Sequence, residues 1–68
     1  MEWNPVTDSL HRAVHGGVEL LVWREPDSWA WAAFRITGPN SEANVVLGTG
    51  EGESEEEAKA KAEHHARD

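Results

Sequence analysis

The chain has 68 residues, which suffice for one small domain but not for a doubly wound sheet, a barrel enzyme or a second domain. It contains no cysteine, so neither a disulfide nor a thiolate that could act as nucleophile or zinc ligand is available. Thirteen acidic residues stand against six Lys and Arg, giving a formal net charge of −7. This charge disfavours a nucleic-acid binder or an anionic-membrane binder held by phosphate contacts.

Two further features of the sequence bear on location. No apolar run is long enough to span a membrane, which takes about 18 residues or more. The N-terminal residues, Met1 to Pro5, lack the basic region and apolar core of a secretory signal. We therefore expect a cytoplasmic protein that does not interact with membranes.

The N-terminal region can be interpreted in two ways. Residues 9–15 fit a strand that turns at Gly16-Gly17 into the next element, and they also fit a short helix with Leu10, Ala13 and Val14 on one side. We favour the strand.

Three strands are predicted after this region. They are rich in Val, Leu, Ala and Trp, and they cover residues 18–24, 29–37 and 43–49. The short turn Pro26-Asp27-Ser28 predicts that the first two form an antiparallel hairpin, and Gly38-Pro39-Asn40-Ser41 predicts a second turn.

A helix is predicted over residues 55–66. Ser54 is a good N-cap, and Glu57 follows at the spacing of a capping box. Ala58, Ala62 and Ala66 recur every four residues and form a narrow stripe of small side chains. The predicted fold class is α+β: an antiparallel meander of three to four strands with one C-terminal helix packed on one face. An α-β-β-β-α order is the alternative.

Both faces of the predicted sheet are apolar, although one helix covers only one of them. We expect the helix on an aliphatic face formed by Val18, Leu20, Val22, Phe34, Ile36 and Leu47. The opposite face is then a candidate interaction face, formed by Leu21, Trp23, Trp29 and Trp31, with Val46 as a further member. Such a patch indicates self-association or a separate partner. Otherwise Trp3 and the N-terminal segment fold over it, or the helix packs on the Trp side.

Charged residues near the helix suggest a second candidate surface. Glu53, Glu55 and Glu56 form a candidate acidic patch, which fits a solvated, well-capped helix start or an acidic mimic that occupies a basic site of another protein. His11 and His15 are spaced to share a metal, but no third ligand is evident. We predict no metal site, no cofactor, no catalytic residue and no small-molecule substrate.

The segment from Gly48 to Lys59, continued by Ala62 and Ala66, resembles the end of a double-stranded-RNA-binding domain. In that family a G-x-G-x-S turn leads into a helix patterned S-K-K-x-A-K-x-x-A. The resemblance covers residues 45–66 and implies the α-β-β-β-α order. The paired lysines that contact phosphates in that family correspond to Glu55 and Glu56 here, and Lys59 alone matches.

The chain is also similar to small bacterial and phage-borne proteins of unassigned function that have a strand meander and a final S-x-E-E-A helix, and to small antitoxin partners of the HicB type. From all these features we expect a small acidic protein–protein interaction module that is not an enzyme and that forms a homodimer through the Trp-rich face or binds a protein partner. The alternative is a double-stranded-RNA-binding domain with degraded phosphate contacts, which would depend on Lys59 and Lys61.

Overall fold

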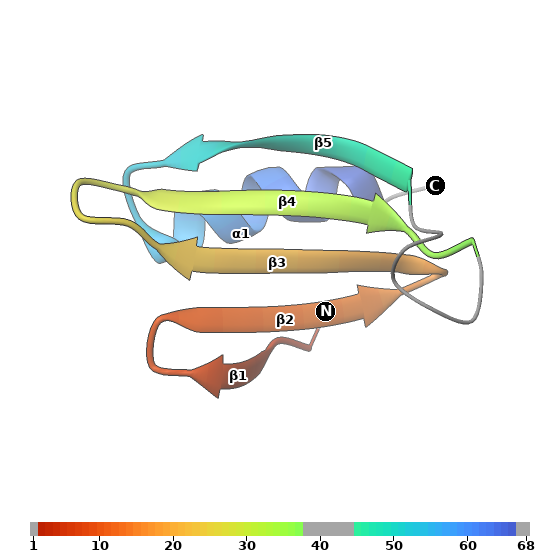
Figure 1. Cartoon of the computed structure of the whole chain (residues 1–68), viewed down its shortest axis with the longest axis horizontal. Coiled ribbons are helices and arrows are strands. Elements are labelled where there is room, and N and C mark those ends of the chain that lie inside the picture. The colour runs from red at the N-terminus through yellow and green to blue at the C-terminus, as the bar shows by residue number, and fades with distance from the viewer. Residues whose placement is uncertain (1, 38–44, 67–68) are drawn as a thin grey trace.

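In the computed structural model, which describes residues 2–37 and 45–66, five antiparallel strands form one sheet and a C-terminal helix packs on it (Figure 1). The strands are neighbours in chain order, so the sheet is a simple meander. The elements are β1 (Asn4–Thr7), β2 (Leu10–His15), β3 (Val18–Arg24), β4 (Trp29–Arg35), β5 (Val45–Gly52), α1 (Glu55–Glu63) and the 3₁₀ turn η2 (His64–Ala66). The predicted α+β class is confirmed, with more strands than the three to four expected.

The N-terminal region is a strand, and the helical alternative for it is wrong. β2 pairs with β3 through a tight turn in which Gly16 and Gly17 have φ angles of 57° and 76°. These two positive φ angles match the hairpin turn whose twist suits antiparallel strands, and glycine adopts them without strain. An additional strand, β1, was not predicted, because its four residues include Pro5. Its pairing with β2 shifts register between Pro5 and Thr7.

The other predicted elements differ from the observed ones mainly at their ends. β3 has the predicted bounds, while β4 ends two residues earlier than expected. β5 extends to Gly52, beyond the predicted end at residue 49. The turn predicted at residues 38–41 and the predicted start of the last strand at 43–44 lie outside the described residues.

The helix begins where its capping residue predicts. The Glu57 amide donates to the Ser54 side-chain oxygen at 3.1 Å, and α1 continues into η2, which ends at Ala66. Two i,i+4 ion pairs lie along it, Lys59 to Glu55 and Lys61 to Glu57, each at 3.1 Å. In the described part of the chain, no helix has the length and apolar character that a membrane span requires.

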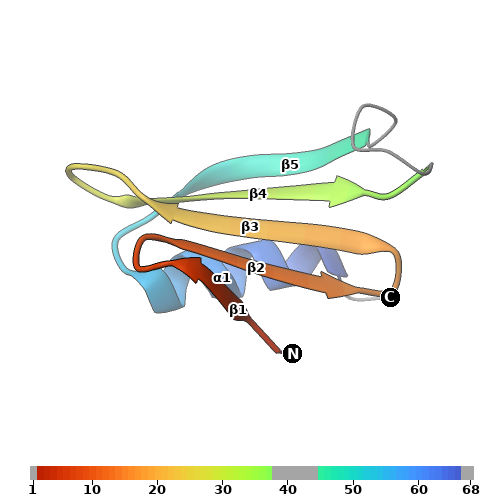
Figure 2. The same cartoon turned by 60° about the horizontal axis from the view of Figure 1, so that its bottom comes forward.

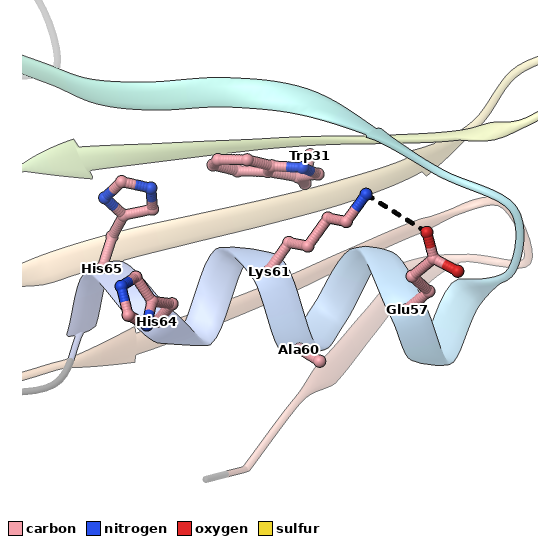
Figure 3. A pocket seen from close by; sticks show the side chains of 6 residues that line it. All are labelled: Trp31, Glu57, Ala60, Lys61, His64 and His65. Atoms are coloured by element: carbon pink, nitrogen blue, oxygen red, sulfur yellow. Dashed lines mark ion pairs between the residues drawn. The ribbon is translucent and has the colours of Figure 1, made fainter.

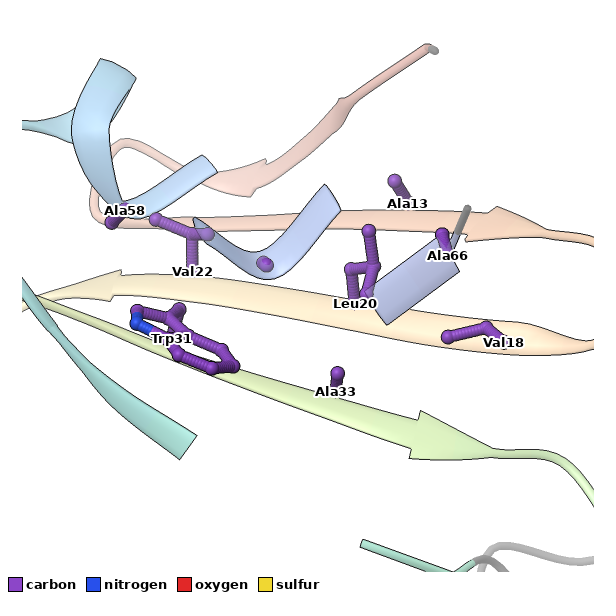
Figure 4. Close-up of a cluster of buried hydrophobic side chains, with 9 residues drawn as sticks. Ala13, Val18, Leu20, Val22, Trp31, Ala33, Ala58 and Ala66 are labelled. Carbon is purple, nitrogen blue, oxygen red and sulfur yellow. The ribbon is translucent and has the colours of Figure 1, made fainter. Parts of the chain in front are cut away.

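The core lies between α1 and one face of the sheet, which we call the covered face (Figures 2 and 4). The alanine stripe predicted on the helix supplies one side of it, with Ala58 and Ala62 fully buried. From the sheet come Leu20 and Val22, both fully buried, and Trp31, which is 8% exposed. The remaining buried members are Ala13, Val18, Ala33 and Ala66.

Glycines in β5 allow this close packing. A Cβ atom on Gly52 would lie 2.8 Å from the backbone nitrogen of Ala58, and one on Gly50 would lie 2.8 Å from Nε1 of Trp31. Both positions therefore exclude any larger residue unless the helix or the indole moves. Gly52 thus makes room for the helix, and Gly50 makes room for the Trp31 ring.

The predicted assignment of β4 to the two faces is wrong. Val22 lies directly opposite Trp31 in the β3–β4 pairing, and residues directly opposite in a sheet share a face. Trp29 and Trp31 therefore lie on the covered face. Phe34 lies on the other face, and Ile36 follows β4 and is 38% exposed.

Candidate functional site: the open face of the sheet

The face of the sheet opposite α1, which we call the open face, carries apolar side chains from four strands. This face is turned toward the viewer in Figure 1, where the helix lies behind the sheet. Strand alternation and the register place these large apolar residues on it: Leu10, Val14, Leu21, Trp23, Phe34 and Val46. They lie in cross-strand rows, with Leu10 opposite Trp23 and Phe34 opposite Val46.

Among the described residues, no element covers this face. α1 contacts β3, β4 and β5 from the other side, and β1 curls toward the helix side (Figure 2). Val14 and Val46 are 47% and 57% exposed, and Leu21, Trp23 and Phe34 are partly exposed. An antiparallel sheet face that meets only water usually carries polar side chains, so this composition is unusual for a bare face.

Two small side chains lie near the centre of the open face. Ala30 and Ala32 of β4 are only 5% and 3% exposed, since larger neighbours surround them. Trp23 lies directly opposite Ala30, and Leu21 lies directly opposite Ala32. Phe34 follows at the other end of β4. The exposed apolar surface of the face therefore comes from these larger side chains.

The open face carries little net charge. Arg12 and Glu19 lie on it and form an ion pair with Nε and Oε2 2.6 Å apart. Glu51 lies on the same side at the sheet edge, opposite Ala30. The region of α1 is different, because five glutamates in residues 53–63 stand against two lysines, Lys59 and Lys61.

The structure divides the predicted interaction face. Leu21 and Trp23 lie on the open face, as predicted, whereas Trp29 and Trp31 lie under the helix. Trp3 is also on the helix side, where its Nε1 donates to Glu63 Oε2 at 2.7 Å. Of the four tryptophans, Trp23 alone is on the open face.

Three members of the open face were missed by the sequence reasoning: Leu10, Val14 and Phe34. The loop between β3 and β4 has four residues, so Arg24 pairs with Trp29 and even-numbered residues of β3 share a face with odd-numbered residues of β4. A hairpin loop of four residues predicts this parity from the sequence. Grouping by side-chain type places Phe34 with the aliphatic residues instead.

A second concave feature lies on the helix side, beside β5 (Figure 3). This groove has a volume of about 460 Å³ and is lined by Trp31, Glu57, Ala60, Lys61, His64 and His65. The rings of Trp31 and His65 are 5.2 Å apart. Nε1 of Trp31 is buried without a hydrogen-bond partner, but it lies over the backbone of Gly50 and has almost no exposed surface, so it does not present a donor to the groove.

The charged candidates are largely paired within the chain. Glu55 contacts both His11, at 3.2 Å, and Lys59. Lys59 also lies 5.4 Å from the centre of the Trp3 ring, and Lys61 donates to the carbonyl oxygen of Glu51 at 2.9 Å.

The predicted acidic patch is exposed only in part. Glu53 and Glu56 are exposed members, whereas Glu55 lies between two basic side chains. Both lysines proposed for RNA contact have intramolecular carboxylate partners, Glu55 for Lys59 and Glu57 for Lys61.

In residues 2–37 and 45–66, no group of three His, Asp or Glu side chains is placed to hold one metal ion. His11 contacts Glu55 and the edge of the Trp29 ring, with ring centroids 6.2 Å apart. His15 is at the end of β2 and is exposed.

Comparison with models of known protein families finds no match, and searches among curated proteins and solved structures find no significant match either.

Proposed function

We propose that this protein is a small acidic protein–protein interaction module that acts through the open face of its sheet. The observation that supports this proposal is the set of partly exposed side chains around Leu21, Trp23 and Phe34, on a face that no described element covers. Contiguous apolar surface of this kind is costly in water and marks interaction sites in soluble proteins. Aromatic side chains are also enriched at protein interfaces.

The position of the polar residues supports the same proposal. A solvated antiparallel sheet alternates apolar and polar residues, yet β4 places Ala30, Ala32 and Phe34 on its uncovered side. Within residues 2–37 and 45–66, the ion pair found on the open face is Arg12 to Glu19, whose charges cancel. A binding partner that covers the face would explain its apolar character.

The test is site-specific photo-cross-linking in cells that produce the protein. A photoreactive amino acid is placed at Val14 or Val46, which are exposed and outside the buried core, so the fold should tolerate it. The matched control places the same amino acid at Ala60, which is exposed on the helix. We expect protein adducts from Val14 and Val46 and none from Ala60.

Two results would contradict the proposal. Irradiation could give no adduct from either open-face position, or it could give equal adducts from Ala60. The mass of the adduct also reports its composition, because cross-linking to a second copy of this chain doubles the mass and cross-linking to another protein gives a different one.

A further inference from the structure

We propose that the partner of the open face is a second copy of this chain, bound face to face about a two-fold axis. This inference rests on the interaction function proposed above and names its partner. Three observations support it: the size of the open face, the distribution of charge in the molecule and the small size of the core beneath the sheet.

The size of the face is compatible with a small dimer interface. The molecule measures 33 by 24 Å in the plane of the sheet (Figure 1), so the projected area of one face has an upper limit of about 790 Å², the product of the two. Specific protein interfaces bury about 800 Å² on each partner. A second copy, which has a face of the same dimensions, can cover the whole open face.

The distribution of charge permits two acidic chains to meet at this face. Each copy carries a net charge of −7, which opposes association in general. Face-to-face packing puts the glutamate-rich α1 of each copy on the outside and brings together the side that carries the neutral Arg12–Glu19 pair, with Glu51 at its edge. Added salt should therefore leave the dimer as tight or make it tighter, because it screens the remaining repulsion between the copies.

The core under the helix is small for an independent domain. Leu20 and Val22 are the largest side chains that are fully buried, and alanine makes up most of the rest. Small domains commonly gain the missing burial by oligomerisation. A second apolar layer across the open face would supply it, and the sheet would then be covered on both sides.

The other candidate route to a dimer runs through the sheet edges, and the two edges differ. β1 is short and contains Pro5, features that discourage strand addition. β5 has eight residues and no proline or lysine, but Lys61 of the helix already donates to one of its carbonyls, that of Glu51. Edge pairing would bury little side-chain surface, so we assign the dimer to the face and let the experiment exclude the edge.

The experiment is light scattering on a sizing column, with the purified chain loaded from about 1 µM to about 1 mM, the range in which moderate association is detected. The wild-type chain should change from monomer to dimer as concentration rises. Leu21→Lys places a charge at the middle of the open face and should raise the dimer dissociation constant at least tenfold, as for a central interface residue. The matched control, Ala60→Lys, makes the same charge change on the exposed helix surface and should leave the constant unchanged.

A second variant guards against a folding defect in the first. Val46 is 57% exposed, so Val46→Lys should keep the native circular dichroism spectrum and still weaken the dimer. A wild-type chain that stays monomeric at every concentration would overturn the inference, and cross-links from Val14 and Val46 to a different protein would then leave the interaction function standing. A dimer that both face variants leave intact would also overturn it and would indicate edge pairing through β5.

Discussion

The two faces of this sheet are both apolar, but they are built from different side chains. The covered face combines Trp31, Leu20 and Val22 with glycine and alanine, and it lets α1 approach until the helix backbone nearly touches Gly52. The open face combines leucine, valine, Phe34 and Trp23 around two alanines. Both faces therefore mix bulky and small residues, and the covered one packs within the chain because glycine in β5 and alanine in α1 allow close contact. Side-chain size alone does not indicate which face is the core.

The largest expected contrast is between two tryptophans on adjacent strands. Trp31 is 8% exposed and lies under the helix, so Trp31→Ala should lower the free energy of unfolding by about 3–5 kcal/mol. For a small domain this is a large share of total stability, and the variant should be mostly unfolded. Trp23 is partly exposed on the open face, so Trp23→Ala should cost about 1 kcal/mol.

The measurement is chemical denaturation of both variants at low protein concentration, so that association does not contribute. Equal losses of stability would mean that the open face belongs to the intramolecular core, and the distinction between the two faces would fail. At high protein concentration, Trp23→Ala should also weaken association. Trp31→Ala is not informative on association, because the variant is mostly unfolded.

A smaller difference in stability is expected between two substitutions in β5, one on the covered face and one on the open face. Gly52→Ala would place a methyl group 2.8 Å from the Ala58 backbone nitrogen, so the helix start must shift, at a cost of about 1–3 kcal/mol. Thr49 lies opposite Ala32, on the open face, and is exposed, so Thr49→Ala should change stability by about 0.5 kcal/mol or less. Thermal unfolding of the two variants measures both values, and a neutral Gly52→Ala would show that the helix is not held against this strand.

Local signals in the sequence were sufficient for most elements. Ser54 followed by Glu57 predicted the helix start, and the structure has the capping hydrogen bond from the Glu57 amide. Gly16 and Gly17 predicted the hairpin, and both have the positive φ angles that such a turn requires. These features depend on residues a few positions apart, so a single sequence contains the information.

The candidate site was predicted only in part, because it depends on how strands are matched across the sheet. Leu21 and Trp23 were assigned to one face correctly, but Trp29 and Trp31 were placed with them although the hairpin register puts Trp31 opposite Val22. The alternation of side chains within each strand was predicted correctly, but the matching of faces between β3 and β4 was wrong. This matching follows from the length of the loop, and a change of one residue in that length exchanges the faces of a whole strand.

β1 shows a different limit of sequence reasoning. Its four residues include Pro5, and neither length nor composition is typical of a strand. It forms because β2 offers an edge beside it, and Trp3, just before it, is fixed by the hydrogen bond to Glu63, sixty residues later in the chain. A contact at that separation is a property of the folded chain and leaves no local pattern.

The smallest expected effect concerns the ion pair of the open face, and it sharpens the comparison of the two faces most directly. Arg12 and Glu19 are 2.6 Å apart, but the Arg12 side chain is 48% exposed, so water screens the pair. A double-mutant cycle with Arg12→Gln and Glu19→Gln at low protein concentration should give a coupling free energy of about 0–1 kcal/mol.

The same cycle repeated at high protein concentration reports whether the open face becomes covered. A second copy would remove water from around the pair, and the loss of one partner from a desolvated pair costs more than the loss from a solvated one. The coupling should therefore rise with concentration if the pair enters an interface between copies. A coupling that stays at its low-concentration value while the chain dimerises would place the interface elsewhere, because no pair on a buried face can keep the screening it has in water.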